Sequence, residues 1–515
     1  MTTQYQILHD TYHDSVQLMR IASDVAQSPA IETTDAVMGT ATNRQTLLEF
    51  DGLTEADLSE VQSDDVVLVA TSPDPDAAAE AVEEMTSRLE SAGDSEKQHD
   101  VASEAPKSIR RACKDSTIAV ALISVSGTYA AREAWKALHE GLHTHVFSDN
   151  VSLEREHDLK TFAHEKGQLL MGPDCGTAIL DGVPLGFANE VSTGSIGLVS
   201  ASGTGLQAVS THISRHGAGI SQAIGTGGRD LSETIKGLTT RTAIEYLDSD
   251  ETTDVIVLIS KPPAEPAVDA VLETISTCET PVIIHFQGVD MNLETVRTAD
   301  TLEETANLAL EVTGNKSESV ESDPEVDKNA LKTEVRSLSA ARTDIRGLFV
   351  GGTLCTEAVL MADKTLEDVS SNVGVGKRLL DPLEPSGHAF IDFGTDELTM
   401  GRPHPMIDPT VRNEQLREAL EQQTTGIVLL DIVLGHGSHQ DPAGSIVDTV
   451  ATTDSNVPII AAVCGTDDDP QSRSEQIRIL RDAGIYVADS NAAAARLAVQ
   501  GATWMTAERP EEGSA

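Results

Sequence analysis

The chain has 515 residues, of which 36 are Lys or Arg and 83 are Asp or Glu, so its formal charge is −47. Such a charge excludes nucleic acid and anionic membrane surfaces as favourable partners, because both repel an acidic protein. Because 39% of the residues are hydrophobic and 38 are glycine, the composition predicts several folded domains rather than a disordered chain. The acidic residues occur in every segment, which is typical of halophilic proteins, and we expect partial unfolding at low salt.

Residues 1–90 contain a helical pattern at 14–25, a strand pattern at 65–71 and a second helical pattern at 77–90. These patterns predict a small α+β domain. We expect the polar segments 91–115 and 314–344 to be linkers, the second of them acidic, and residues 504–515 to form a flexible tail.

From residue 116 onward, β-rich apolar runs alternate with helical patterns. This alternation predicts an α/β fold with parallel sheets whose ligands bind beyond the carboxyl ends of the strands. No apolar run reaches the roughly 20 residues of a membrane-spanning helix, and no secretion signal is visible, so we expect a cytoplasmic protein without a membrane partner. The five cysteines form no CxxC pair, and the sequence predicts no metal site.

The clearest local motif is a buried strand that runs into Ser202, Gly203, Thr204 and Gly205 and then directly into an amphipathic helix. The free amides and the dipole of a helix N-terminus attract anions, and glycine lets the backbone approach a ligand closely. We interpret this turn as a phosphate or anion site; an ordinary tight turn is the alternative.

A second junction of this kind contains Gly435, His436, Gly437, Ser438 and His439, and a helix is expected to begin near residue 441. Histidines beside a helix N-terminus can bind an anion, donate a proton or accept a phosphoryl group. The alternative is that both histidines are surface polar residues.

Weaker candidates follow other strands. Gly227, Gly228 and Arg229 combine backbone amides with a guanidinium that suits a carboxylate or phosphate, although a salt bridge from Arg229 to Asp230 is an equal alternative.

Glycine turns at 350–353 and 463–466 are routine at strand-to-helix junctions. Prolines stiffen the loop that carries Arg402 and His404, which favours a functional role for these residues. No P-loop, Rossmann glycine motif or GxSxG motif is present.

Several of these motifs together resemble the FdrA family, relatives of succinyl-CoA synthetase. The resemblance is carried by LLMGPDCGTAILDGVPLGFAN (169–189), SIGLVSASGTGLQAV (195–209), AIGTGGRDLS (223–232) and LISKPP (258–263). It extends over nearly the whole chain through DSVQLMRIASDV (14–25), GHAFIDFGTDELTMGRPHPMIDP (387–409) and LLDIVLGHGSHQDPAG (429–444).

The resemblance implies a CoA-binding-type Rossmann unit at 116–190, in which Gly127, Thr128 and Tyr129 would contact CoA. It implies two flavodoxin-like ligase domains, at 191–313 (α-subunit-like) and at 345–503 (like the C-terminal part of the β subunit). In the synthetases, helix N-termini from these two halves cradle a phosphohistidine. The resemblance places the junctions at 200–205 and 435–441 in those positions.

The chain departs from the synthetases at two points. Where they carry a Gly-His-Ala-Gly-Ala motif with the phosphohistidine, this chain reads HFQGVDMNLETV (285–296). Where they carry a supporting glutamate, this chain has Lys261. A cation in that position suits a bound anion better than a histidine.

The resemblance implies an acyl-CoA synthetase-like subunit of an enzyme that transfers an acyl group through an acyl phosphate, with CoA as cofactor, partner subunits and an oligomeric state. A CoA-independent carbamoyltransferase component that uses carbamoyl phosphate is the first alternative, since FdrA relatives have been linked to oxamate carbamoyltransferase. A noncatalytic regulatory subunit is the second. The carbamoyltransferase interpretation fits the departures better, because Lys261 and Arg229 could stabilise a departing phosphate. Under either enzymatic interpretation, His436 or His439 moves a proton or accepts phosphate, and Arg402 and His404 orient the substrate.

Overall fold

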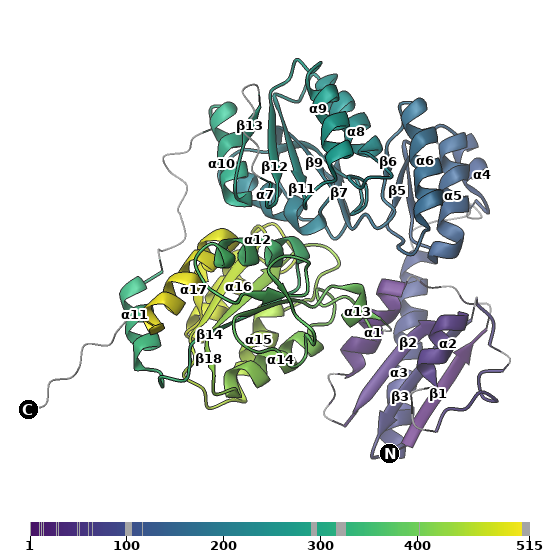
Figure 1. Ribbon diagram of the computed structural model, residues 1–515. Coiled ribbons are helices and arrows are strands. Elements are labelled where there is room, and N and C mark those ends of the chain that lie inside the picture. Colours follow the sequence, from purple (N-terminus) through teal and green to yellow (C-terminus); the bar gives the residue numbers. More distant parts are fainter. Residues whose placement is uncertain are drawn as a thin grey trace, which may run out of the picture. The chain divides into compact units, whose positions relative to one another are not determined.

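The computed structural model describes residues 2–506 except 10, 12, 14, 27, 29, 49, 51, 60, 64, 98–105, 116, 290–295, 316–325 and 401 (Figure 1). The chain forms two compact units. One contains residues 1–106 and 396–408, and the other contains residues 107–395 and 409–515. Of the helices in the described part of the chain, none has the length and apolar character needed to cross a membrane.

The first unit contains the small α+β domain that the sequence predicts. Its elements are β1 (Thr2–Leu8), α1 (Ser15–Ala26), β2 (Thr33–Met38), α2 (Ala41–Leu47), β3 (Val66–Ser72), α3 (Pro75–Lys97) and the short α13 (Asp396–Thr399). The sheet has the order β1-β3-β2, and β3 is antiparallel to both neighbours. Strand β3 is buried along its whole length because α1 and α3 cover one face of the sheet, whereas Leu47, Leu53 and Leu58 cover the other.

The segments expected to be linkers contain helices. Helix α3 continues to Lys97, α4 spans Ile109–Asp115 and α11 spans Lys328–Ser337. Helix α11 forms because Leu331 and Val335, four residues apart, share one face and are fully buried. Residues 504–506 of the expected tail belong to helix α17 (Asn491–Thr506). The rest of these predictions concerns residues 98–105, 316–325 and 507–515, which lie outside the described residues.

The second unit begins with a small parallel sheet of order β4-β5-β6. Its elements are β4 (Val120–Ile123), α5 (Gly127–His139), β5 (His143–Val146), α6 (Leu153–Glu165) and β6 (Leu170–Met171). A seven-stranded sheet follows, of order β13-β12-β11-β9-β10-β7-β8. The β7–β8 hairpin pairs antiparallel with β10, so this sheet includes strands that precede the boundary expected at residue 190.

The strands of this sheet are β7 (Thr177–Leu180), β8 (Val183–Gly186), β9 (Thr193–Ser200), β10 (Ile220–Gly225), β11 (Val255–Ser260), β12 (Val282–Phe286) and β13 (Arg297–Thr298). Its helices are α7 (Gly203–Arg215), α8 (Leu238–Asp248), α9 (Glu265–Ile275) and α10 (Leu302–Val312). Strands β9 to β13 are parallel.

The third sheet is entirely parallel and has the order β16-β15-β17-β14-β18-β19-β20. Its strands are β14 (Asp344–Phe349), β15 (Ser370–Ser371), β16 (Lys377–Arg378), β17 (Ala389–Asp392), β18 (Thr425–Val433), β19 (Ile459–Cys464) and β20 (Tyr486–Ala488). Its helices are α12 (Gly352–Asp363), α14 (Thr410–Glu421), α15 (Pro442–Ala451), α16 (Arg473–Asp482) and α17.

Both seven-stranded sheets have a doubly wound arrangement, in which β9 lies between β10 and β11 in one sheet and β14 lies between β17 and β18 in the other. Helices cover both faces of each sheet (Figure 1). Helices α7 and α10 lie on one face of the first large sheet and pack against α12 and α17, which lie on one face of the other. This packing brings together the N-terminal turns of α7, which follows β9, and α12, which follows β14.

Candidate anion-binding site

Helix α7 begins with amides that are free to bind a ligand. The hydroxyl oxygen of its N-cap, Ser202, accepts a hydrogen bond from the Gly205 amide at 3.0 Å. Among the described residues, no acceptor is found for the amides of Gly203 and Thr204. Glycine is required at position 205, because a Cβ there would lie 2.8 Å from the Ser202 hydroxyl.

Helix α12 begins at the same place and is open in the same way. Its N-cap is Gly351, which offers no side chain, and a Cβ at this position would lie 3.0 Å from a methyl carbon of Thr204. The Ser202 hydroxyl is hydrogen-bonded to the hydroxyl of Thr353. Within the described ranges, the amides of Gly352, Thr353 and Leu354 have no acceptor. Two helix N-termini thus present free N–H groups side by side, which is the arrangement that binds anions.

Lys261 supplies a cation at this point. It directly follows β11 and is exposed, and its ammonium nitrogen lies 3.6 Å from the position that a Cβ on Gly352 would occupy. Its positive charge lowers the pKa of the nearby Asp392 and of the buried thiol of Cys355. The helix N-termini and Lys261 together contribute positive charge at this point of a protein whose net charge is −47. We call this the α7/α12 cradle.

Two carboxylates border the cradle, and the sequence motifs did not indicate either of them. Asp431 of β18 is fully buried and accepts hydrogen bonds from the amides of Val350, at 2.7 Å, and Gly351, at 2.8 Å. Burial raises the pKa of Asp431 to about 7, although these amides and the nearby Arg412 oppose the shift. Asp392 ends β17 and lies against Gly352. In the sequence, Asp392 and Asp431 could have been recognised as acidic residues within runs of apolar strand residues.

Gln287 stands where the resemblance places the start of the phosphohistidine segment. It directly follows β12 and is 1% exposed. Its side-chain amide nitrogen donates a hydrogen bond to the carbonyl oxygen of Thr353 at 2.9 Å. Its side-chain oxygen is buried and has no partner among the described residues. Gln287 therefore connects the end of β12 to the first turn of α12.

The junction at 435–441 was expected to supply the second helix of the cradle. The helix whose start is hydrogen-bonded to Ser202 is α12, which follows β14, whereas α15 follows β18. In the first turn of α15 the amide of Gly444 is bonded to Asp441 at 3.0 Å, as Gly205 is to Ser202 in α7, but the amide of Ala443 is also bonded, to Gln476 at 2.8 Å. The turn at 350–353, which looked routine in the sequence, is the one that begins beside Ser202.

The loop that carries the two histidines is held by its own neighbours. Gln471 bonds to the amide and the carbonyl of Gly435, and Gly437 lies against the ring of Phe187. His436 pairs with Glu190 at 2.7 Å, and both side chains are partly exposed. The Nδ1 atom of His439 accepts the amide of Asp441 at 3.1 Å. The buried hydroxyl of Ser438 has no partner in the described residues.

Arg229 is engaged in a salt bridge, but with a different residue from the one considered in the sequence. It pairs with the buried Glu156 at 2.6 Å, whereas Asp230 pairs with Lys160 at 2.7 Å. Helix α6 is thereby tied to the loop after β10. This loop includes Gly227, whose φ is +85°, and Gly228, and it lies at the same edge of the sheet as Ser202 because β9 and β10 are parallel.

The remaining predicted residues lie elsewhere. Gly127, Thr128 and Tyr129 open helix α5, whose N-cap Ser126 makes no side-chain hydrogen bond. Arg402 and His404 belong to the other compact unit. Burial lowers the pKa of His404 to about 4.

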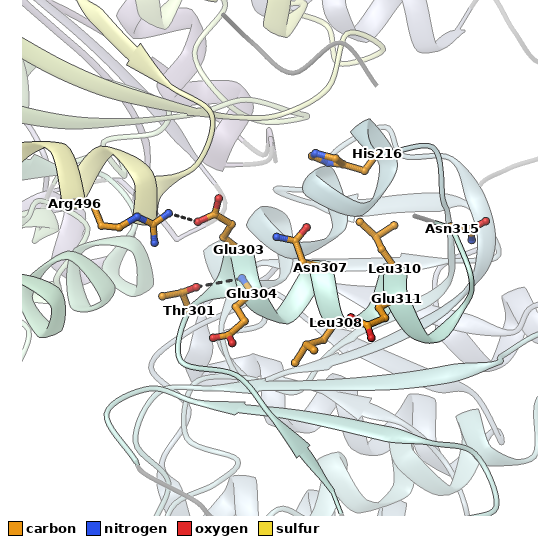
Figure 2. Close-up of a pocket in the computed structure, with 10 residues that line it drawn as sticks. All are labelled: His216, Thr301, Glu303, Glu304, Asn307, Leu308, Leu310, Glu311, Asn315 and Arg496. Carbon is orange, nitrogen blue, oxygen red and sulfur yellow. Dashed lines mark hydrogen bonds and ion pairs between the residues drawn. The ribbon is translucent and has the colours of Figure 1, made fainter. Parts of the chain in front are cut away.

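A cavity of about 660 Å³ lies along α10, where three glutamates (Glu303, Glu304 and Glu311) are among its lining residues. Figure 2 shows Arg496 directed at Glu303, with which it forms an ion pair, and Thr301 beside the amide of Glu304. His216, at the C-terminal end of α7, also lines this cavity. Helix α7 has 13 residues, so the cavity is about 20 Å from the N-terminal turn of α7. None of the glycine-rich turns lines it.

No group of three or more His, Cys, Asp or Glu side chains is arranged to hold a metal ion in the portion of the chain that the structure describes.

The paired helix N-termini on two doubly wound sheets define a class, the succinyl-CoA ligase-like proteins of the acyl-CoA synthetase superfamily. Family models agree with this assignment. The CoA-ligase model matches residues 348–500 and the CoA binding domain model matches residues 191–288. A third model, described as AllF, heavy metal-associated domain, matches residues 1–106.

The relatives identify the family. The protein YahF of Escherichia coli strain K12, described as uncharacterized, is 39% identical over 507 residues, which cover 95% of this chain and 97% of YahF. The chain therefore belongs to the FdrA family of succinyl-CoA synthetase-like proteins. The α subunit of the ADP-forming succinate–CoA ligase of Aquifex aeolicus is 26% identical over 190 residues, which cover 35% of this chain and 60% of that subunit.

Among solved structures, the dinucleotide-forming acetyl-coenzyme A synthetase 1 of Ca. Korarchaeum cryptofilum matches with a TM-score of 0.33 and 14% identity, over 78% of this chain and 86% of that one. The family assignment rests on the sequence matches.

Two of these matches bear on possible ligands. The segment expected to be the CoA-binding unit, 116–190, lies outside the three matched segments, so that assignment remains a prediction. Residues 1–106 contain no cysteine, and the thiolate donors that soft metals prefer are therefore absent from the segment that resembles a heavy metal-associated domain. A thiolate metal site does not fit this domain.

Proposed function

We propose that the chain is a subunit of an enzyme that transfers an acyl group through an acyl phosphate, whose phosphoryl group binds in the α7/α12 cradle. The single observation that supports this most directly is the meeting of two open helix N-termini, joined by the Ser202–Thr353 hydrogen bond, beside Lys261. This arrangement suits a phosphoryl group because its oxygens can accept several N–H bonds at once.

The chemistry follows from where charge develops. A nucleophile attacks the acyl carbon, the bond between that carbon and the bridging oxygen breaks, and the electron pair leaves with the phosphate. The amides of Gly203, Thr204, Gly352 and Thr353 and the ammonium group of Lys261 stabilise the charge on the departing phosphate. The helices hold these donors in place before the reaction, so little reorganisation is needed.

In the ligase version of this function, CoA supplies the thiol that receives the acyl group. The first turn of α5, with Gly127 and Thr128, would hold its phosphates, because Ser126 leaves the amides of this turn uncapped. Partner subunits would supply nucleotide handling. We propose a cytoplasmic location and an oligomeric assembly for this version.

The second candidate is a CoA-independent carbamoyl or acyl transferase component, and one observation favours it. Gln287 directly follows β12 in the segment that replaces the phosphohistidine motif of the synthetases, and no histidine occurs in the sequence between His285 and His388. A direct transfer from an acyl phosphate needs the cradle and a cation but no carrier histidine.

Calorimetric titration in molar KCl tests both versions, with CoA, carbamoyl phosphate and inorganic phosphate as ligands and with wild type compared to Lys261→Ala. The ligase version predicts CoA binding that does not depend on Lys261. The CoA-independent version predicts that carbamoyl phosphate and phosphate bind, that both need Lys261, and that CoA gives no heat. If none of the three ligands bound to the wild-type protein, the proposal would be wrong.

A further inference from the structure

Asp392 lies against the first residue of α12, and neither the family matches nor the sequence motifs assign it a role. One of its carboxylate oxygens, Oδ2, is 2.5 Å from the position that a Cβ on Gly352 would occupy. The ammonium nitrogen of Lys261 is 3.6 Å from the same position. The carboxylate and the ammonium group thus both lie near Gly352, at the opening of the cradle.

The two oxygens of Asp392 differ in their bonding. Oδ1 accepts the amide of Gly394 at 2.8 Å, which holds the side chain in place. Oδ2 has no donor among the described residues, although Asp392 is only 6% exposed. A carboxylate oxygen without a donor gains a hydrogen bond from a ligand that offers a hydrogen.

The groups around Asp392 favour its holding or sharing a proton. Burial raises the pKa of Asp392, whereas the Gly394 amide and Lys261 lower it. Two other ionisable groups interact with Asp392. Its negative charge raises the pKa of Asp431 on β18 and that of the buried thiol of Cys355 on α12. Lys261 is the cation that offsets these acidic neighbours.

We propose that Asp392 determines which oxyanion the cradle accepts, by sharing one proton with an oxygen of the bound phosphoryl group. This proposal rests on the function proposed above for the cradle and deepens it. An oxyanion that brings its own proton, such as inorganic phosphate, donates an O–H bond to Oδ2 while its other oxygens accept the helix amides. Sulfate carries no proton near neutral pH and faces Oδ2 with a negative charge.

The proton on Asp392 also explains how protons are conserved in the transfer reaction. When the acyl phosphate is consumed, the nucleophile loses one proton and the departing phosphate gains one. A carboxyl group beside the phosphoryl oxygen can receive the first proton and deliver the second, so no further acid or base is needed for the balance.

The test compares phosphate with sulfate by calorimetric titration in molar KCl at about pH 8, where the two anions have similar charge but only phosphate retains a proton. We expect wild type to bind phosphate at least about 30-fold more tightly than sulfate, by more than about 2 kcal/mol. In Asp392→Asn the amide can donate a hydrogen bond to either anion. The ratio of the two affinities should therefore fall to about threefold or less, mainly through a gain in sulfate affinity.

A second measurement needs no variant and thus does not depend on how Asp392→Asn folds. Because sulfate binding requires Asp392 to take up a proton from solvent, its affinity for wild type should fall as the pH rises from about 6 to about 8, while phosphate affinity changes less. Lys364→Met, which removes a cation from the far end of α12, serves as the control and should retain the wild-type ratio.

The outcomes separate the two proposals. Equal affinity of wild type for phosphate and sulfate, or an unchanged ratio in a folded Asp392→Asn protein, would overturn the role of Asp392 and leave the cradle intact. If wild type bound neither anion, both the cradle and the role of Asp392 would be wrong.

Discussion

The junctions at β14–α12 and β18–α15 look alike in the sequence, because each joins a buried strand to a helix through glycine-rich residues. In the structure they differ. At β14–α12, the loop amides of Val350 and Gly351 bind Asp431, and the amides that follow are open. At β18–α15, Gln471 holds the loop and Asp441 caps the helix.

This difference teaches that a glycine-rich strand-to-helix turn binds an anion only if its amides are not already used by the protein. Histidines made the β18–α15 junction more conspicuous in the sequence. The β14–α12 junction instead carries no side chain at its N-cap, because Gly351 lies against Thr204. The less conspicuous junction is the one whose amides remain available.

The largest effect that separates the two junctions is expected for Gly352→Val. Its Cβ would lie 2.5 Å from Asp392 Oδ2, and its methyl groups would fill the opening of the cradle. We expect phosphate affinity to fall at least about 30-fold, by more than about 2 kcal/mol. Titration calorimetry measures it, with Ser438→Ala at the other junction as the control. A Gly352→Val protein that binds phosphate normally would contradict the cradle.

A pH-dependent effect of up to about 4 kcal/mol on stability, a different quantity from phosphate affinity, is expected for Asp431. Its pKa is raised by burial to about 7 in the folded protein, from about 4 in the unfolded chain. The folded state therefore binds more protons between these values, and the contribution of Asp431 to stability is full below about pH 4 and is lost as the pH rises through about 7.

Denaturant unfolding at several pH values tests this. Relative to Asp431→Asn, the wild-type protein should become less stable as the pH rises from about 4 to about 7. Gln471, which holds the other junction, is neutral, so Gln471→Leu should lower stability by the same amount at each pH. A pH-independent difference for Asp431→Asn would contradict the raised pKa.

A tenfold effect, about 1.4 kcal/mol, is expected for Lys261→Met, because this change removes the cation beside Gly352. Phosphate affinity is again the measurement. Lys364→Met removes the same charge at the other end of α12 and should change the affinity by less than about twofold. Equal losses in the two variants would mean that Lys261 acts only through the net charge of the protein.

The smallest effect is expected for His436→Ala. The His436–Glu190 pair is 44% and 41% exposed at its two side chains, and exposed pairs contribute about 0–1 kcal/mol. We expect phosphate affinity to stay within about twofold of wild type. A loss of tenfold or more would restore the histidine loop as part of the anion site.

Sequence alone determined the fold class and the first half of the cradle. Alternating apolar strands and helical patterns require parallel βαβ units, and the turn at Ser202–Gly205 is recognisable because its strand, glycines and helix are consecutive. Lys261 was singled out through the resemblance, as the residue that stands where the synthetases carry a supporting glutamate. These features are local, so the spacing of the residues carries the information.

The tertiary structure decided which helix faces α7. The packing of α7 and α10 against α12 and α17 brings Thr353 to Ser202, although 151 positions separate them in the chain. The same packing places Asp392 and Lys261, which come from different sheets, beside Gly352. No periodicity or motif records such contacts, because they depend on how two sheets pack and on which backbone amides the protein's own side chains have already bonded.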